Sequence, residues 1–169
     1  VYFNSNNQNV AWQSTADGVV SMPNQCSFSA FMSQANPTIT GNPTKIPYQS
    51  TRWDTGSDFD TSNNRFVAPV EGKYLFQINH NAYGITGGNY LRTQVYVNGG
   101  LYQILGYIRP GDGGDHTVND SILISLSQSD YVEVYSSSND GSYSLSATNS
   151  WNSFSGILVG KEKIMPDIS

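Results

Sequence analysis

The sequence has few charged residues and few of the residues that favour helices. Charged residues make up 12% of the 169 residues, and the formal net charge is −5. A basic stripe, the usual mark of a nucleic-acid-binding surface, is missing from the sequence. No apolar run approaches the roughly 18 residues that a membrane-spanning helix needs, and no long segment has a 3.6-residue apolar period. We therefore expect no nucleic-acid partner, no membrane insertion and few helices.

Cysteine is nearly absent as well. The single cysteine, Cys26, cannot form a disulfide within the chain, so the fold does not depend on one. We interpret Cys26 as a small buried apolar side chain rather than a reactive thiol. The sequence starts at Val1 and shows no secretory signal, so we expect it to be a fragment of a longer polypeptide.

What the sequence does contain is abundant Ser, Thr, Asn, Gly and Tyr, with strand-forming residues in short blocks between turn residues. The clearest block runs from Lys73 to Asn79, where polar and apolar residues alternate. This two-residue period is typical of a strand with one buried face. Many such blocks in series predict an all-β sandwich or barrel.

The blocks divide the chain into three parts. Residues 1–25 form an N-terminal stalk segment with two short strands, at 9–14 and 19–22, and residues 161–169 form a poorly ordered tail. Residues 26–160 form the main domain, and turn residues such as Asn98-Gly-Gly100 separate its strands. We predict ten strands there, near 26–34, 44–49, 64–68, 73–83, 89–98, 101–109, 116–127, 130–137, 143–148 and 152–160.

Two of these strands are apolar on both faces, at Ile122-Leu-Ile124 and Ile157-Leu-Val159. One face of each can line the core, but the other face needs cover, which a loop or the residue 1–25 segment could also supply. We favour contact between subunits, because a bare aliphatic strand surface is typical of an interface. The predicted interface residues are Ile122, Leu123, Ile124, Ile157 and Val159.

Several short blocks occur in an order that resembles a known family. They include Phe28-Ser-Ala30, Asn64-Arg-Phe66, Gly72-Lys-Tyr-Leu-Phe76, Val97-Asn-Gly99 and Ser153-Phe-Ser-Gly156. Together they resemble the C1q/TNF-like globular head, a ten-stranded antiparallel jelly roll, over about residues 26–160. The resemblance implies a homotrimer around a threefold axis. It also implies a core made by Phe28, Phe66, Tyr74, Phe76 and Phe154, with Gly72 permitting a turn and Pro69 ending strand pairing.

The lead-in from Gly18 to Ala30 resembles the segment that precedes such domains in bacteriophage tail fibres and other virion proteins. Animal members carry a collagen stem with glycine at every third position, and residues 1–25 have no such repeat. The resemblance therefore favours a virion appendage, or otherwise an extracellular location, over an animal complement protein.

The sequence offers little material for catalysis. Its two histidines, His80 and His116, belong to no metal-binding or nucleophile motif, and there is no Gly-x-Ser-x-Gly elbow or phosphate-binding loop. Sequence alone leaves open a spatial pair of carboxylates for sugar cleavage. We expect a protein without enzymatic activity.

Calcium is the most plausible ion, because a hard cation needs several oxygen ligands. Asp112 and Asp115 lie in a glycine-rich stretch whose carbonyl groups could complete the shell, and a second acidic group comprises Asp54, Asp58 and Asp60. The alternative is that these aspartates are solvated turn residues.

Aromatic residues near predicted strand ends are candidates for a sugar-binding site. Trp53, Tyr102 and Tyr107 have Asn, Asp or Ser nearby, and a flat ring beside polar groups suits a sugar. These rings could instead pack over a sheet edge or between subunits, which is what we expect for Trp151.

Three functions remain open. The first is a trimeric recognition head of a phage tail fibre or virion appendage, which binds a host cell-surface glycan or protein. The second is a structural trimerisation or decoration domain without a ligand. The third is a secreted carbohydrate-binding module, which would be a monomer of 18.5 kDa.

Overall fold

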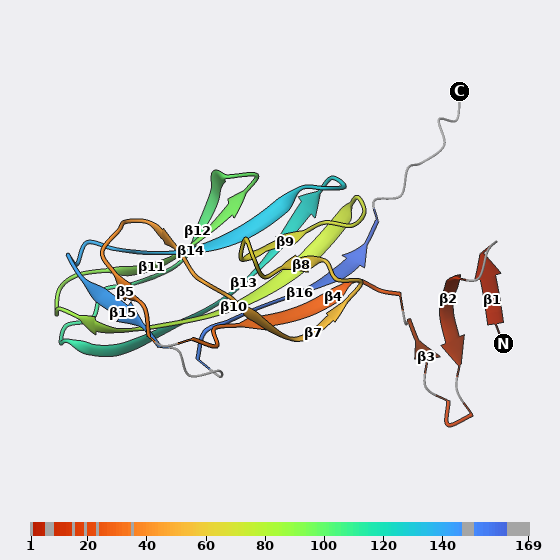
Figure 1. Ribbon diagram of the computed structural model, residues 1–169, viewed down its shortest axis with the longest axis horizontal. Coiled ribbons are helices and arrows are strands. Elements are labelled where there is room, and N and C mark those ends of the chain that lie inside the picture. The colour runs from red at the N-terminus through yellow and green to blue at the C-terminus, as the bar shows by residue number, and fades with distance from the viewer. Residues whose placement is uncertain are drawn as a thin grey trace.

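The computed structural model in Figure 1 describes residues 2–5, 9–14, 16–18, 20–22, 24–34, 36–146 and 151–161. All regular elements in these ranges are strands. Residues beyond Lys161, where we expected a poorly ordered tail, lie outside the described residues.

The N-terminal segment forms a small antiparallel sheet of its own, in the order β1-β2-β3. Its strands are β1 (Tyr2–Ser5), β2 (Asn9–Ser14) and β3 (Val20–Ser21). The sequence predicted the second and third of these but not the first. The division of the chain at residue 25 stays a prediction.

The main domain is a jelly roll of two antiparallel sheets that face each other (Figure 1). We call the larger one the β10 sheet. Most of its strands form one row of hydrogen-bonded neighbours, and β13 also pairs with β10 outside this row. Along the row the strands are β5 (Thr38–Ile39), β15 (Tyr143–Leu145), β10 (Gly72–Ile85), β16 (Ser153–Gly160), β4 (Ser27–Phe31) and β7 (Ser50–Thr55), and β13 spans Gly114–Leu126.

The second sheet, which we call the β11 sheet, completes the sandwich. Strand β6 (Thr44–Lys45) pairs with β14 outside the row that the other strands of this sheet form. Along the row the strands are β12 (Gly100–Ile108), β11 (Leu91–Val97), β14 (Tyr131–Ser138), β9 (Arg65–Val67) and β8 (Phe59–Asp60).

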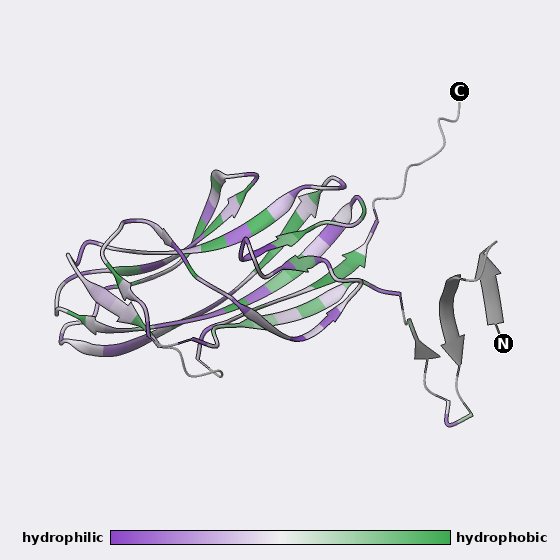
Figure 2. Cartoon of the chain, viewed as in Figure 1, coloured by the Kyte–Doolittle hydropathy of each residue, from purple (hydrophilic) through white to green (hydrophobic). Residues whose placement is uncertain are grey.

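Alternating residues along the strands build the core, and Figure 2 shows the resulting mixture of apolar and polar positions on neighbouring strands. All five aromatic residues expected in the core are buried. The Phe28 ring is at their centre, with its centroid 5.0 Å from the ring centroids of both Phe66 and Phe154. Such ring pairs contribute roughly 0.5–1.5 kcal/mol each beyond the area they bury. The aromatic cluster therefore joins β4 and β16 of one sheet to β9 of the other.

Gly156 and Gly72 are both required by close packing. A Cβ atom on Gly156 would lie 2.5 Å from a Phe28 ring carbon and 2.7 Å from a Phe76 ring carbon. A Cβ on Gly72 would lie 2.7 Å from Leu158 Cδ1. We expected Gly72 to permit a turn, but it is the first residue of β10 and has no positive φ. Its role is to let β16 approach β10.

The strands differ from the prediction mainly between residues 38 and 60. The strand predicted near 44–49 is regular only over Thr44–Lys45, although Ile46 and Tyr48 are buried beyond its end. Strand β7 was not predicted, because Ser50–Thr55 shows no apolar alternation. It is an edge strand whose side chains are exposed or half-buried on both faces, so the sequence carries no two-residue period there.

Candidate functional site

The outward face of the β10 sheet is apolar at one end. Because Tyr74 and Phe76 point into the core, Leu75 between them points away from the sandwich. Strand register places Leu75 between Leu123 of β13 and Ile157 of β16. These three side chains and Val159 are between 41% and 58% exposed. We call Leu75, Leu123, Ile157 and Val159 the apolar face.

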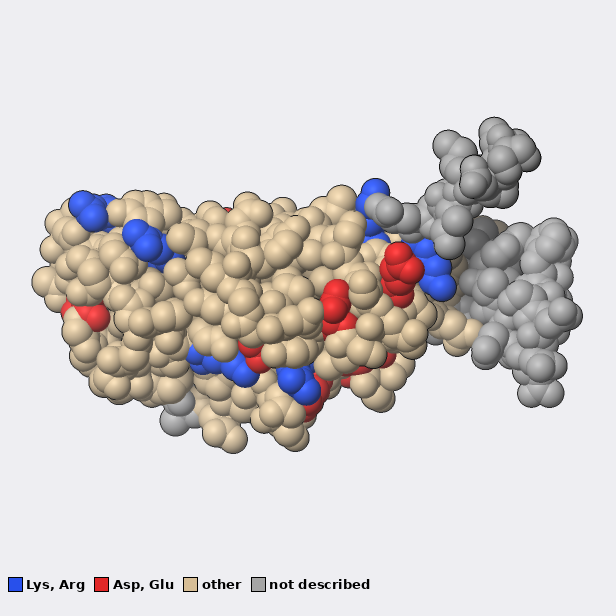
Figure 3. All heavy atoms as spheres, turned by 90° about the horizontal axis from the view of Figure 1, so that it is seen from above, with Lys and Arg blue, Asp and Glu red and all other residues tan. Residues whose placement is uncertain are grey.

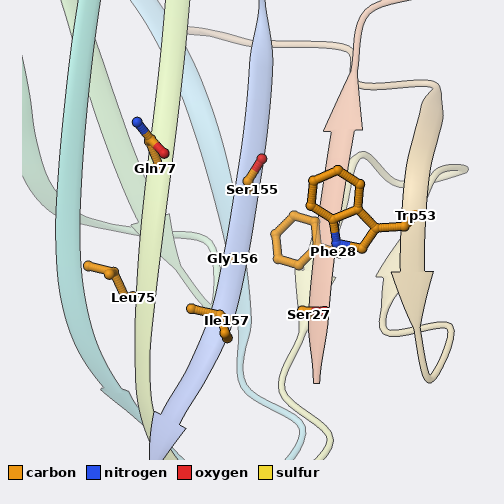
Figure 4. Close-up of a pocket in the computed structure, with 8 residues that line it drawn as sticks. All are labelled: Ser27, Phe28, Trp53, Leu75, Gln77, Ser155, Gly156 and Ile157. Carbon is orange, nitrogen blue, oxygen red and sulfur yellow. The ribbon is translucent and has the colours of Figure 1, made fainter. Parts of the chain in front are cut away.

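A groove of about 340 Å³ runs beside the apolar face. Figure 4 shows the Trp53 ring of β7 on one side and Leu75 of β10 on the other, with Ile157 of β16 between them. Gly156 also lines the groove, and its missing side chain leaves the Phe28 ring at the floor. Trp53 is 53% exposed, so its ring forms a wall of the groove rather than part of the core.

The structure divides the five predicted interface residues into two groups. Leu123, Ile157 and Val159 belong to the apolar face. Ile124 is only 1% exposed and lies in the core, and Ile122 is partly buried against the same core. The prediction for Ile124 is therefore wrong, because residues 122 and 124 share the inward face of β13 and only residue 123 points outward.

A second exposed apolar surface lies on β12, at the edge of the β11 sheet. Among the strands that the structure describes, it pairs with β11 alone. We call its exposed side chains, Leu101, Tyr102, Ile104 and Tyr107, the β12 edge. Bare strand edges tend to pair or associate with other chains unless they are covered.

The three aromatic residues predicted to bind a ligand do not converge. Trp53 lies on β7 of the β10 sheet, whereas Tyr102 and Tyr107 lie on β12 of the β11 sheet. The Tyr107 ring stacks on Tyr90 with centroids 5.8 Å apart, and the Arg92 guanidinium carbon lies 3.9 Å from the Tyr90 centroid. Tyr107 therefore belongs to a planar stack on the surface.

The two predicted calcium ligands, Asp112 and Asp115, lie in different kinds of structure. Asp112 is exposed in the connection from β12 to β13, whereas Asp115 lies in β13 and lines a polar pocket. Within the described ranges, no three or more His, Cys, Asp or Glu residues come together to hold a metal ion. Asp112 and Asp115 are therefore not part of such a cluster in the described part of the chain.

The second acidic group stabilises turns. The Asp54 carboxylate accepts hydrogen bonds from the backbone N–H groups of Asp58 (3.0 Å) and Phe59 (3.1 Å). Asp60 accepts from the backbone N–H of Asn63 (3.0 Å), and hydrogen bonds from Asn63 hold its pKa below the usual value. These carboxylates act as the turn residues that the alternative interpretation describes.

Two buried residues, His80 and Cys26, have side chains of the kind that can serve as a base or a nucleophile. His80 is fully buried, its Nδ1 lies 3.0 Å from Thr93 Oγ1, and burial lowers its pKa to about 3. Burial and a hydrogen bond with Asp58 raise the pKa of the Cys26 thiol. Neither group is available as a nucleophile or base near neutral pH.

A polar pocket of about 350 Å³ on the outward face of the β10 sheet was not predicted from the sequence. The pattern that could have predicted this pocket is the alternation of inward and outward residues along β10, which continues beyond Gln77 and places further polar residues on the outward face. Recognising the pocket also required the register between β10 and β13. Its lining residues are Asn79, Asn81, Asp115, Thr117, Asn119 and Trp151.

Charged side chains are sparse on the molecular surface. Figure 3 shows scattered Lys, Arg, Asp and Glu side chains on one face, most of which consists of other residues. Among the described residues, no helix has the length and apolar character needed to span a membrane.

A match to a known protein family agrees with the fold and the aromatic core. The C1q domain family matches residues 27–159, which is most of the chain. The chain belongs to the C1q domain family.

Two curated relatives of the C1q-like chain come from Bacillus subtilis (strain 168). The protein YqcC is 34% identical over 106 residues, which cover 58% of this chain and 28% of YqcC. The phage-like element PBSX protein XkdV is 34% identical over 104 residues, which cover 57% of this chain and 15% of XkdV. The matched region is thus less than a third of either relative, and one relative belongs to a phage-like element.

Solved structures confirm the C1q/TNF jelly roll. The globular domain of zebrafish complement 1qA has a TM-score of 0.57 and 16% identity, and the match covers 81% of this chain and 98% of that one. The Eiger TNF of S. frugiperda has a TM-score of 0.63 and 7% identity, and the match covers 86% of this chain and 98% of that one. At these identities the likeness concerns the fold alone.

Proposed function

We propose that this C1q domain is the non-enzymatic, homotrimeric recognition head of a phage tail fibre or similar virion appendage, and that it binds a ligand on the host cell surface. The apolar face is the observation that carries this proposal. Four aliphatic side chains side by side on one sheet face form a surface that soluble monomers seldom expose. A second copy of the chain would remove this surface from water.

The β12 edge suggests how the copies would meet. It lies on the β11 sheet, whereas the apolar face and its groove lie on the β10 sheet, so a contact between the two surfaces joins unlike parts of neighbouring subunits. Contacts of this kind form closed rings when the rotation between copies closes. Three copies agree with the general behaviour of C1q/TNF domains, and each would bury one β12 edge and one apolar face.

The similarity to a protein of a phage-like element supports the location on a virion. XkdV belongs to a phage-like element, and the matched 104 residues lie within the C1q-like chain. Trimerisation would strengthen attachment to the host, because three weak sites on one particle bind a surface together.

Binding to bacterial surface glycans and to whole cells tests the recognition role. We expect the purified protein to bind at least one surface glycan or cell type, and an Ile157→Asp variant, which loses the trimer, to bind much more weakly. A trimer that binds no glycan, no cell and no surface protein would contradict recognition and support the structural trimerisation or decoration domain. A monomer that binds sugars would instead support the secreted carbohydrate-binding module.

A further inference from the structure

An arginine and two tyrosines form a cluster on the outward face of the β11 sheet. Arg92 of β11 pairs across the sheet with Tyr107 of β12. The next pair along these strands, Leu91 with Ile108, packs in and against the core. Because successive residues of a strand point to opposite faces, Arg92 and Tyr107 point away from the core. We call Tyr90, Arg92 and Tyr107 the arginine cluster.

The two tyrosine rings hold the guanidinium group of Arg92. Its carbon lies 3.9 Å from the ring centroid of Tyr90 and 5.1 Å from that of Tyr107. Tyr90 is positioned in turn, because its backbone N–H donates to Asn139 Oδ1 at 2.7 Å and its hydroxyl accepts from the Asn42 side chain at 3.5 Å. A guanidinium group that is already held in place loses less conformational entropy when it binds a ligand.

The N–H groups of the Arg92 side chain have no partner within the described part of the chain. The guanidinium makes no ion pair there, and its Nε is buried and makes no hydrogen bond. Nε is the one nitrogen of this half-buried side chain that is both buried and unpaired, so the two terminal nitrogens lie at the surface. A fixed guanidinium with unused donors suits a carboxylate or a phosphate, which it can bind through two parallel hydrogen bonds.

Arg65 shows what Arg92 lacks. The guanidinium carbon of Arg65 also lies over a tyrosine ring, 4.6 Å from the Tyr131 centroid. There the Nε lies 3.5 Å from Asp60 Oδ2, so the positive charge has an acidic partner in the same subunit. Arg92 has the same kind of aromatic support without such a partner, and an anion from outside the chain would supply one.

A second cation lies beside the arginine cluster. Arg109 directly follows β12, is exposed, and forms no ion pair with another described residue. The alternation that places Tyr107 on the outward face predicts the same face for Arg109, two residues further on. Two unpaired positive charges on one surface attract anions.

The acidic residues of the neighbouring connections do not neutralise these arginines by ion pairs. The Asp140 carboxylate accepts hydrogen bonds from the Thr86 backbone N–H and the Asn89 side chain, and the Thr86 bond lowers the pKa of this carboxyl. Asp112 is exposed and forms no ion pair within the described ranges.

The arginine cluster stays accessible in the proposed trimer. That trimer turns the β10 sheet towards neighbouring subunits, whereas the cluster lies on the outward face of the other sheet. Tyr107 is the last residue of the β12 edge, five residues beyond Tyr102, or roughly 16 Å at about 3.3 Å per residue. Its ring packs on Tyr90 of the same subunit rather than extending from the strand edge.

The cluster also lies at the end of the sandwich that would meet a host. It sits where β10 ends and β11 begins, whereas the chain enters β4 and leaves β16 at the opposite end (Figure 1). A head attached through its N-terminal segment would therefore hold this end away from the virion.

We propose that Arg92, held by Tyr90 and Tyr107, binds the carboxylate or phosphate group of an acidic sugar on the host surface, with Arg109 as a second cation. The proposal rests on the recognition function above and names the ligand class and the site. The Tyr107 ring, which is 49% exposed, offers an apolar surface to the C–H groups of the sugar. A trimer carries three such sites, which can bind a surface together.

Titration with three related sugars tests the ligand class. Glucuronic acid carries a carboxylate, glucose-6-phosphate carries a phosphate, and glucose is the neutral control, with binding followed by calorimetry. We expect at least one acidic sugar to bind with a Kd in the millimolar range or tighter, and at least tenfold more tightly than glucose. Comparison of the two acidic sugars shows which anionic group the site prefers. Binding of neither acidic sugar, or of both no more tightly than glucose, would overturn the proposal.

Variants assign the binding to the arginine cluster. Arg92→Gln should weaken binding of the acidic sugar at least tenfold. Arg109→Gln, at an exposed position outside the strands, should weaken it at least threefold, and it tests the site if Arg92→Gln disturbs folding. Arg65→Gln is the matched control, because it removes an arginine that lies on a tyrosine ring but already has an acidic partner, and it should change binding less than twofold. Unchanged binding in both Arg92→Gln and Arg109→Gln would overturn the site.

The two proposals fail in different ways. A monomeric protein whose binding of an acidic sugar depends on Arg92 contradicts the trimeric head but supports the site. A trimeric protein that binds host cells equally well with and without Arg92→Gln supports the head but overturns the site.

Discussion

Gly156 lies where the rings of Phe28 and Phe76 leave no room for a side chain, and it also lines the groove that faces outward. The sequence placed Gly156 in a Phe-x-Gly block but gave no reason for the glycine. Glycine is needed because the Phe28 and Phe76 rings lie directly against this position of β16. This packing depends on residues far apart in the sequence.

Replacing Gly156 by alanine should therefore destabilise the domain. A single extra carbon in a filled core typically costs about 1–3 kcal/mol, and chemical denaturation of Gly156→Ala should show a loss in this range. Gly141→Ala is the matched control, since a Cβ at Gly141 meets no atom within 4 Å. Equal stability of the two variants would show that the core can absorb the extra carbon.

His80 makes the stability of the domain depend on pH. Burial lowers its pKa to about 3 in the folded state, whereas an unfolded histidine titrates near 6.5. Below pH 6.5 the unfolded chain binds a proton that the folded chain refuses, so stability falls as pH falls from about 6.5 towards about 3. The slope for this one proton approaches ~1.4 kcal/mol per pH unit.

Comparison with His80→Gln isolates this effect. Glutamine can still bond to Thr93 but does not titrate, so the variant should lose less stability between pH 6.5 and pH 4. The comparison is needed because Asp120, whose pKa is raised by burial, has the opposite effect and is present in both proteins. Parallel stability curves for the two proteins would contradict the assignment to His80.

At the scale of single strands, the sequence was most informative where one face is buried and least informative at the edges. Strand β10 has a strict two-residue period over its first half, and its position was predicted within two residues at each end. Edge strand β7 has no buried face of its own and was not predicted. The same limit applies to the polar pocket, because its residues come together only through the register of β10 with β13.

The β12 edge should contribute to association between subunits. In the described part of the chain, Tyr102 and Ile104 are exposed on an edge strand. The double variant Tyr102→Ser/Ile104→Ser should therefore fold normally, but its proposed trimer should dissociate at concentrations at least tenfold higher than those at which the unmodified protein dissociates. Gln103→Ser, an exposed polar change on the same strand, should leave association unchanged. Gel filtration over a dilution series measures both, and identical behaviour of the two variants would exclude β12 from the contact.

At the scale of the whole molecule, the apolar strands were recognised from the sequence, but the division of their faces was not. Apolar residues at 122, 123 and 124 are compatible with either orientation of β13, and only the packing of the two sheets shows that Leu123 points outward. The C1q fold followed from short ordered blocks, and the resemblance to virion proteins followed from the lead-in between Gly18 and Ala30. The proposed contact surface on β12 did not follow from the sequence, because an exposed edge has no distinctive pattern.

Leu123→Asp and Ile157→Asp should therefore produce folded monomers. Each new carboxylate is solvated in a single subunit but would be buried without a partner in the trimer, at a cost of several kcal/mol. Ser62→Asp adds the same charge at an exposed turn and should not affect assembly. Ile124→Asp should instead unfold the subunit, because Ile124 lies in the core. Circular dichroism and gel filtration distinguish these results.

In the proposed assembly, the apolar face and the β12 edge join three copies of this domain. Analytical ultracentrifugation of the purified chain over a wide range of concentrations measures the mass of the assembly. We predict a single species with three times the chain mass of 18.5 kDa, which persists on dilution into the micromolar range. A folded species of 18.5 kDa at every concentration would contradict this assembly.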